Sequence, residues 1–299
     1  MKKLLSVLLC AAMLLCLLPL EARAAAAAWD GTVDISWYDP AQTEYTIDTP
    51  AKLAGLAALV NGMADPAAKA IVGDRSYLVS KKADNVMLVG AGGGNVFDTV
   101  YTGGVDFAYK TIYLTADLDM GGRKAADGSW TGPNWTPIGG KFPMKPQEAS
   151  GDCLTLDTRF NGVLDGQGHT IYNLYCDRCA AKGFPYSMAV GVVGFLGGNA
   201  DYANGGNGEK TEAEFENGWQ PAVRNLVLGS GSIYGRRMVG GIVGRVGETS
   251  NGVVIENCGN RADVRNTDSK GVGGICGSAW GAGTIRGCYN TGTISTTYT

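Results

Sequence analysis

The C-terminal half of the chain repeats a short pattern of apolar and glycine positions. The stretch "GGIVGRVG" at 240–247 recurs as "GGICGSAWG" at 273–281, and a weaker copy, "VGVVGFLG", lies at 190–197. Apolar second runs follow, such as "VIENCGNRADV" and "TIRGCYNTGTI". Short β-rich runs that recur every 30 to 33 residues predict stacked units, because one unit cannot bury its apolar face without a neighbour.

The second runs align in columns that predict a corner of the chain. One column contains only Asn and Gly: Asn173, Asn225, Asn257 and Gly287. These two residue types accept a left-handed backbone most readily, so we expect all four to occupy one stacked corner. The apolar column beside it contains Cys258 and Cys288, which are therefore expected to be neighbours on adjacent turns, either as a disulfide or as two thiols.

This pattern favours an all-β fold of the parallel β-helix, or solenoid, type over residues 111–299, with equivalent residues stacked about 4.8 Å apart. A flat β-sandwich is the alternative. A leucine-rich repeat would need a Leu spacing that is absent from the sequence, and a propeller would need about four strands in each repeat.

One helix is predicted before the repeats, over residues 50–61. In "TPAKLAGLAALVNG", Thr49 is placed to cap the helix, Pro50 stands at the first helical position and Gly62 at the stop. Its apolar face would cover the first turn of the stack, as solenoids require. Residues 25–110 are therefore expected to form an N-terminal capping region.

Residues 1–24, "MKKLLSVLLCAAMLLCLLPLEARA", have the pattern of a cleaved secretory signal. Two lysines precede a long apolar run, and small residues flank Arg23 at the end. A retained membrane anchor is the alternative for this segment. We expect the mature chain to be secreted or bound to the cell surface, with no membrane span.

Composition narrows the class of protein. The 299 residues include 46 glycines, which indicates many tight corners, and the 45% hydrophobic content suits a packed core. A chain with a net charge of −3 is expected to bind nucleic acids poorly, because nucleic acids are also negatively charged. No nucleic-acid partner is expected.

The ordered succession of these motifs resembles a known group, the bacterial surface proteins that carry the GLUG motif. The resemblance rests on "VGGIVGRVG", "VGGICGSAWG", "IENCGN" and "IRGCYNTGTI", and on the lead-in "YTIDTPAKLAGLAALVNG", "TIYLTADLDM", "WTPIGG" and "FNGVLDGQGHTIYNL". It covers roughly residues 29–299. It implies a right-handed parallel β-helix on a secreted or wall-associated protein, and it implies no single activity.

An enzyme of the polysaccharide lyase or hydrolase class is the alternative function, since such enzymes also use β-helices. Their chemistry needs clustered carboxylates that act as acid and base or bind Ca²⁺. The candidates are Asp117, Asp119 and Asp127, with Asp165 further along. We expect these side chains to cap turns instead, with no resident metal or cofactor. The single histidine, His169, is expected to have a structural role.

Two further motifs are read as structural. "CDRC" at 176–179, with Cys153, resembles half of a zinc site, but its second half is missing, so a disulfide or free thiols are favoured. "VGAGGGN" at 89–95 is interpreted as a loop, because no helix pattern follows the glycines as a dinucleotide site would require.

Four tryptophans in or beside Gly-rich loops are the candidate ligand-binding residues: Trp130, Trp135, Trp219 and Trp280. Exposed aromatic faces on a rigid scaffold stack on sugars or contact another protein. The sequence therefore predicts a non-catalytic surface module, used for adhesion, ligand presentation or spacing, with glycans or cell-surface proteins as partners. The last residues include no polar closing repeat, so further turns, another module or end-to-end association are expected at that face.

Overall fold

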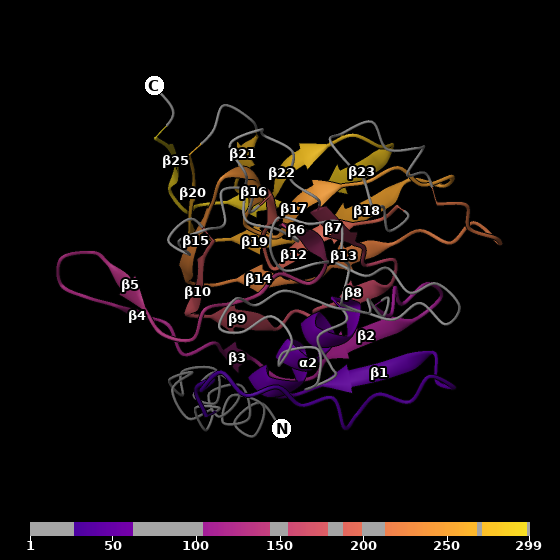
Figure 1. Cartoon of the computed structure of the whole chain (residues 1–299), viewed down its shortest axis with the longest axis horizontal. Helices are drawn as coiled ribbons and strands as arrows, with labels where there is room; N and C mark the ends of the chain where they lie inside the picture. Colours follow the sequence, from indigo (N-terminus) through magenta and orange to yellow (C-terminus); the bar gives the residue numbers. More distant parts are fainter. Residues whose placement is uncertain are drawn as a thin grey trace, which may run out of the picture.

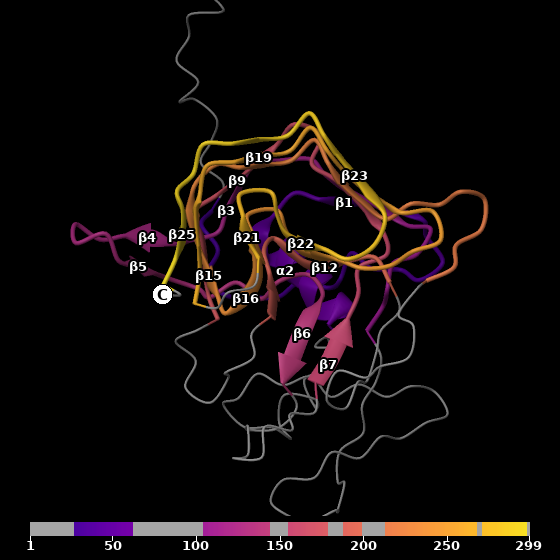
Figure 2. The same cartoon turned by 90° about the horizontal axis from the view of Figure 1, so that it is seen from above.

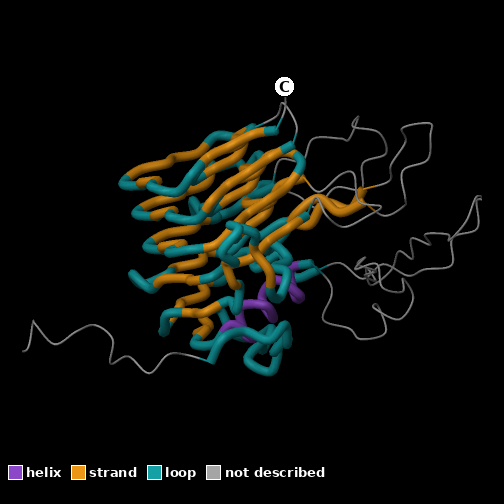
Figure 3. Tube along the Cα trace, turned by 90° about the vertical axis from the view of Figure 1, so that its left-hand side faces the viewer, coloured by secondary structure: helices purple, strands orange, loops and turns teal. Residues whose placement is uncertain are grey.

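The computed structural model describes residues 27–61, 104–143, 155–178, 188–198, 213–267 and 271–297. Within these ranges the fold is all-β, with parallel strands in stacked sheets and one short helix. Figure 3 shows the strands as successive layers, with the helix at one end. The predicted signal at 1–24, the loop at 89–95, Cys153 and Cys179 lie outside the described residues.

Two parallel sheets meet at the corner that the sequence predicts (Figure 1). The first contains, in spatial order, β1 (Glu44–Ile47), β2 (Thr111–Leu114), β8 (Val163–Asp165), β13 (Ala222–Arg224), β18 (Val253–Glu256) and β23 (Gly283–Arg286). The second, called the β14 sheet below, contains β3 (Leu118–Asp119), β9 (Thr170–Tyr172), β14 (Val227–Leu228), β19 (Gly259–Asn260) and β24 (Tyr289–Asn290).

Three further sheets complete the turns. One contains β10 (Leu174–Asp177), β15 (Gly231–Gly235), β20 (Asp263–Asn266) and β25 (Ile294–Thr296). The next contains β7 (Thr155–Thr158), β6 (Gly140–Pro143), β11 (Met188–Val190), β16 (Arg237–Gly240) and β21 (Val272–Gly273), with β6 antiparallel to both of its neighbours. The last contains β12 (Val193–Leu196), β17 (Val243–Val246) and β22 (Cys276–Ala279), and β4 (Arg123–Lys124) with β5 (Trp130–Thr131) forms a projecting hairpin.

The strand pairing follows the sequence repeat. Val243 pairs with Cys276, 33 positions further on, and Ile255 pairs with Ile285, 30 positions further on. Neighbouring parallel strands thus come from successive turns, and the turns lie on one another in the views of Figures 1 and 2. The period of the sequence repeat therefore equals the number of residues between paired strands.

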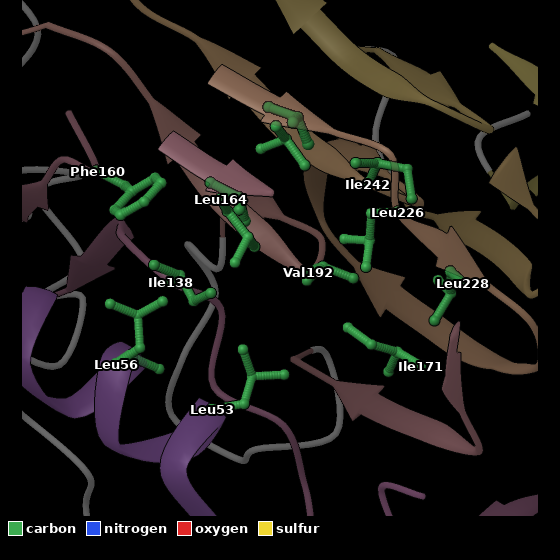
Figure 4. Packing of buried hydrophobic residues seen from close by; sticks show 14 of the residues in the cluster. Leu53, Leu56, Ile138, Phe160, Leu164, Ile171, Val192, Leu226, Leu228 and Ile242 are labelled. Carbon is green, nitrogen blue, oxygen red and sulfur yellow. The ribbon is translucent and has the colours of Figure 1, made fainter. Parts of the chain in front are cut away.

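The helix α2 (Pro50–Val60) covers the end of the stack at which the described chain begins. Thr49 caps it by accepting a hydrogen bond from the Lys52 amide at 3.3 Å, and the backbone N–H of Asn61 caps the other end. Its Leu53 and Leu56 are fully buried and lie in one cluster with apolar residues of the turns (Figure 4). The helix predicted for 50–61 is therefore present, one residue shorter.

The Gly-rich motif has a packing function between two sheets. Gly194, Gly244 and Gly277 hold equivalent positions in β12, β17 and β22. A Cβ atom added to Gly244 would lie 2.3 Å from the Val190 backbone nitrogen, and one added to Gly277 would lie 2.5 Å from the Val239 nitrogen. Only glycine allows such close approach of two backbones, which explains why the motif repeats.

Candidate functional site

Three of the four predicted corner residues form one column. Asn225, Asn257 and Gly287 follow strands that pair in register, and their φ angles are +53°, +52° and +62°. All three have the left-handed conformation that the Asn and Gly pattern predicts. The stacked corner is confirmed for these residues.

The placement of Asn173 in this column is wrong. Asn173 also has a left-handed φ, +56°, but it follows β9 and lies beside Ser230, whose hydroxyl is 2.9 Å from the Asn173 amide nitrogen. The strand that pairs with Val223 contains Leu164, so the first copy occupies the next corner of the turn. Asn173 and Asn225 both have a left-handed φ and both have an apolar residue two positions before and one position after, so their local sequences are alike although their corners differ.

Side-chain amides form a ladder along the corner. Asn257 Nδ2 donates to Asn225 Oδ1 at 3.2 Å, and Asn225 Nδ2 donates to Asp165 Oδ1 at 3.0 Å. The Arg224 Nε donates to the other oxygen of the carboxylate at 2.9 Å. Burial acts to raise the pKa of Asp165, but the hydrogen bonds from Asn225 and from the Gln167 amide, with the Arg224 charge, together hold this pKa below its ordinary value. The ladder thus ends on an ionised carboxylate.

A groove lies beside this ladder and borders the β14 sheet. Its volume is about 440 Å³, and its lining consists of Gln167, Gly168, Asn225, Val227 and Asn257. Gln167 and Asn257 are exposed, so the groove has side-chain amides at its surface. Amides both donate and accept hydrogen bonds. The arrangement suits a ligand with many hydroxyl groups.

Two tyrosines on the outer face of the β14 sheet extend this surface, and neither is among the residues predicted from the sequence. Tyr172 and Tyr289 are each 41% exposed. A Cβ atom on Gly229 would lie 2.9 Å from the Tyr172 ring, and one on Gly259 would lie 2.3 Å from the Tyr289 ring. Each ring therefore covers a glycine. The available signal was the alternation in "TIYNL", which places Tyr172 on the solvent side of its strand.

The carboxylates considered for catalysis do not gather. Asp117 accepts hydrogen bonds from the Thr170 amide at 3.0 Å and pairs with His169 Nδ1 at 3.1 Å, which gives the histidine a place at the entrance of β9. Within the described ranges no three His, Cys, Asp or Glu side chains form a group that could hold a metal ion.

Asp119 and Asp127 also have local partners. Asp119 Oδ1 accepts from the Gly121 amide at 2.9 Å and from Asn173 Nδ2 at 3.0 Å. Asp127 accepts from the Ser129 amide and hydroxyl in the hairpin turn between β4 and β5. Each of these carboxylates accepts hydrogen bonds in a different turn.

Trp135 is not a ligand-binding residue. It is 1% exposed, and its indole N–H lies 3.2 Å from the Gly191 carbonyl oxygen and 3.3 Å from that of Val192. The loop that contains it turns inward, so the large ring fills the core between sheets. Burial of a Trp with its N–H satisfied is the usual outcome for such a ring.

The other three tryptophans lie at separate places on the surface. Trp219 is half-buried, and its ring centroid is 5.4 Å from that of the exposed Tyr109. Trp280 is 63% exposed, with the Arg245 guanidinium 4.5 Å from its ring. Trp130 is half-buried in the β4–β5 hairpin. These three do not form one binding surface, and a ligand role for each stays a prediction.

The four described cysteines form no disulfide with one another. Cys258 and Cys288 follow equivalent corner positions on adjacent turns, as predicted, since β19 pairs in register with β24. Burial raises the pKa of Cys258 to about 12 and that of Cys276 to about 11. Cys176, the first cysteine of "CDRC", is fully buried opposite Ile233. These thiols act as small apolar side chains of the core.

Comparisons with known proteins agree with the repeat pattern. The GLUG motif matches residues 268–295. The chain is 32% identical over 142 residues to halomucin of Haloquadratum walsbyi (strain DSM 16790 / HBSQ001), a match that covers 44% of this chain and 1% of halomucin. No solved structure matches. The chain thus carries a GLUG motif and spans a very small part of the curated relative that it matches.

The helical content bears on membrane association. The one helix in the described ranges, α2, has 11 residues, too few to cross a bilayer.

Proposed function

We propose that this chain is a module of a secreted bacterial surface protein that folds as a right-handed parallel β-helix and acts without catalysis, as a ligand-presenting scaffold or a spacer. The observation that carries the proposal is the register: strands of each turn pair with equivalent strands one repeat away. Stacked turns of this kind form extended scaffolds that can present binding surfaces. The GLUG motif and the similarity to halomucin support a surface-associated repeat protein.

The carboxylates favour a scaffold over a carbohydrate-active enzyme. A lyase or hydrolase needs two or more carboxyl groups that converge on one substrate bond. Asp117, Asp119 and Asp127 instead accept hydrogen bonds from three different local partners, and Asp165 ends the amide ladder. Each of these carboxylates therefore stabilises a different part of the fold.

Localisation tests the proposal directly. The full-length gene, tagged at a surface loop and expressed in its own host, should give a product that external protease removes from intact cells or that appears in the medium. A cytoplasmic protein should survive the same protease treatment as the control. Recovery of the tagged chain only inside the cell would contradict the surface role.

A second measurement separates scaffold from enzyme. Incubation of the mature chain with acidic polysaccharides should release no new reducing ends and no unsaturated sugars. Release of either product, abolished in Asp119→Ala but retained in Asp127→Ala, would overturn the non-catalytic assignment.

A further inference from the structure

The outer face of the β14 sheet has an unusual composition for a sheet surface. Each of its two outward columns contains one tyrosine directly beside one glycine: Tyr172 stands beside Gly229, and Tyr289 stands beside Gly259. Glycine in a strand weakens it and often marks a site where another group approaches closely. Here the tyrosine rings occupy the space that side chains at the glycines would fill.

The two rings lean toward each other across the sheet. Tyr172 in β9 covers a glycine one strand above it, and Tyr289 in β24 covers a glycine one strand below it. With strands about 4.8 Å apart, their Cα atoms are roughly 14 Å apart along the stack. β9, β14, β19 and β24 follow one another in this order, and Figure 1 shows the first three one above another. The result is a flat strip with an aromatic ring at each end.

Polar side chains also lie along the strip, where they could form hydrogen bonds with the hydroxyl groups of a bound ligand. The groove of about 440 Å³ shares Val227 with the β14 sheet and presents the amides of Gln167 and Asn257. Within the described part of the chain, the side-chain amide of Gln167 and Asn257 Oδ1 have no hydrogen-bond partner, whereas the Gln167 backbone N–H donates to Asp165 and Asn257 Nδ2 donates to Asn225. Arg261 lies between the rings, with its Nη2 3.2 Å from the Tyr289 hydroxyl.

We infer that this strip, formed by Tyr172, Arg261 and Tyr289 with the amide groove beside it, binds a polysaccharide chain; the inference rests on the proposed surface function. Sugar rings have apolar faces that stack on exposed aromatic rings, and their equatorial hydroxyls pair with amide and guanidinium groups. A linear sugar chain that runs across the strands would contact one ring at each end. Arg261 provides a positive charge for a carboxylate if the sugars are uronic acids.

Binding is tested with the full chain by isothermal titration with two probes, a hexasaccharide of polygalacturonate and a hexasaccharide of cellulose. We expect at least one of them to bind, and Tyr172→Ala and Tyr289→Ala each to weaken that binding by roughly tenfold. Tyr234→Ala is the matched control, because Tyr234 lies on β15 in a neighbouring sheet, with the Arg265 guanidinium 5.0 Å from its ring. It should leave the affinity unchanged.

Further variants separate stacking from folding. Tyr289→Phe keeps the ring and should retain binding, whereas Asn257→Gly removes an amide while keeping a residue that accepts the φ of +52°. Asn257→Gly should therefore weaken binding without a large fall in thermal stability. Binding of polygalacturonate alone, reduced by Arg261→Ala, would assign the strip to acidic chains, and equal binding of both probes would assign it to neutral stacking.

Two results would overturn the inference: neither hexasaccharide binds, or Tyr234→Ala reduces affinity as much as Tyr172→Ala does. Either can occur while the chain is on the cell surface, in which case the proposed function stands and only this strip loses its role. Conversely, a chain found only in the cytoplasm would remove the surface function even if the sugar bound in the calorimeter.

Discussion

The last two turns of the described stack have similar sequences but very different environments. Ile255 in β18 is fully buried, while its partner Ile285 in β23 is 52% exposed. Val264 in β20 is fully buried, while its partner Ile294 in β25 is 37% exposed. Apolar residues at equivalent positions thus lie in the core in one turn and at the surface in the next. Burial in a stacked fold is supplied by the neighbouring turn.

At the opposite end of the stack, a helix covers the apolar side chains. There, α2 places Leu53 and Leu56 against the first turns, and both are fully buried. A helix satisfies its own backbone hydrogen bonds, so it can cover a stack of apolar side chains without continuing the sheets. The contrast between the two ends predicts how strongly each turn contributes to stability.

The largest difference should come from truncating the paired isoleucines. Ile255→Ala removes a fully buried side chain and should lower the free energy of unfolding by about 2–5 kcal/mol. Ile285→Ala, at a half-exposed site, should lower it by less than about 1 kcal/mol. Urea denaturation of the mature chain measures both. Equal losses would mean that the last turn is covered in solution.

A glycine in the Gly-rich motif should give the next largest effect. Gly244→Ala would place a Cβ 2.3 Å from the Val190 backbone nitrogen, and relieving this contact should cost about 1–3 kcal/mol. Gly283→Ala is the control in the last turn, since its nearest neighbour is a Val253 methyl at 3.0 Å. Thermal unfolding should show a clear loss for the first variant and a smaller one for the second.

Asp165 should make stability depend on pH. Because its folded pKa lies below the ordinary value of 3.8, the stabilisation is complete above that value and is lost as the pH falls through the folded pKa. Asp165→Asn should cost about 1–2 kcal/mol at neutral pH and flatten the acid limb of the stability curve.

Glu256→Gln is the comparison one turn higher. The partner of Glu256, Arg286, is 67% exposed, so removing this ion pair should cost less than about 1 kcal/mol. An unchanged acid limb in Asp165→Asn would show that the carboxylate at the base of the ladder does not contribute.

The smallest effect concerns reactivity alone. Cys258 is fully buried with its pKa raised to about 12, so iodoacetamide should label it far more slowly than Cys288 in the half-exposed last turn. Mass mapping after labelling without reductant measures both. Protection of both thiols until a reductant is added would indicate a disulfide between the turns.

Much of the fold could be predicted because its signals are local. The helix at 50–60 has its cap and proline in the sequence, and the Asn and Gly corner at Asn225, Asn257 and Gly287 needs only a left-handed residue. The error at Asn173 has the same origin, because an Asn with a left-handed φ and similar apolar neighbours occurs at two different corners. Local pattern identifies a corner but does not say which one.

The candidate site was less accessible from sequence. Trp135 was expected at the surface because it lies in a Gly-rich loop, yet the loop folds into the core. Tyr172 and Tyr289 are 117 positions apart and have no shared motif. They lie on one strip only because three strand pairings bring β9 and β24 into the same sheet.

The sequence by itself determined the all-β class, the repeat of 30 to 33 residues, the short helix and the residues that can turn a corner, since each depends on backbone preference or on apolar spacing. Only the tertiary structure decided which equivalent residues are buried, which corner each Asn occupies and which aromatic rings share a surface. Those properties depend on contacts between turns. The register of the strand pairing decides which residues of neighbouring turns come into contact.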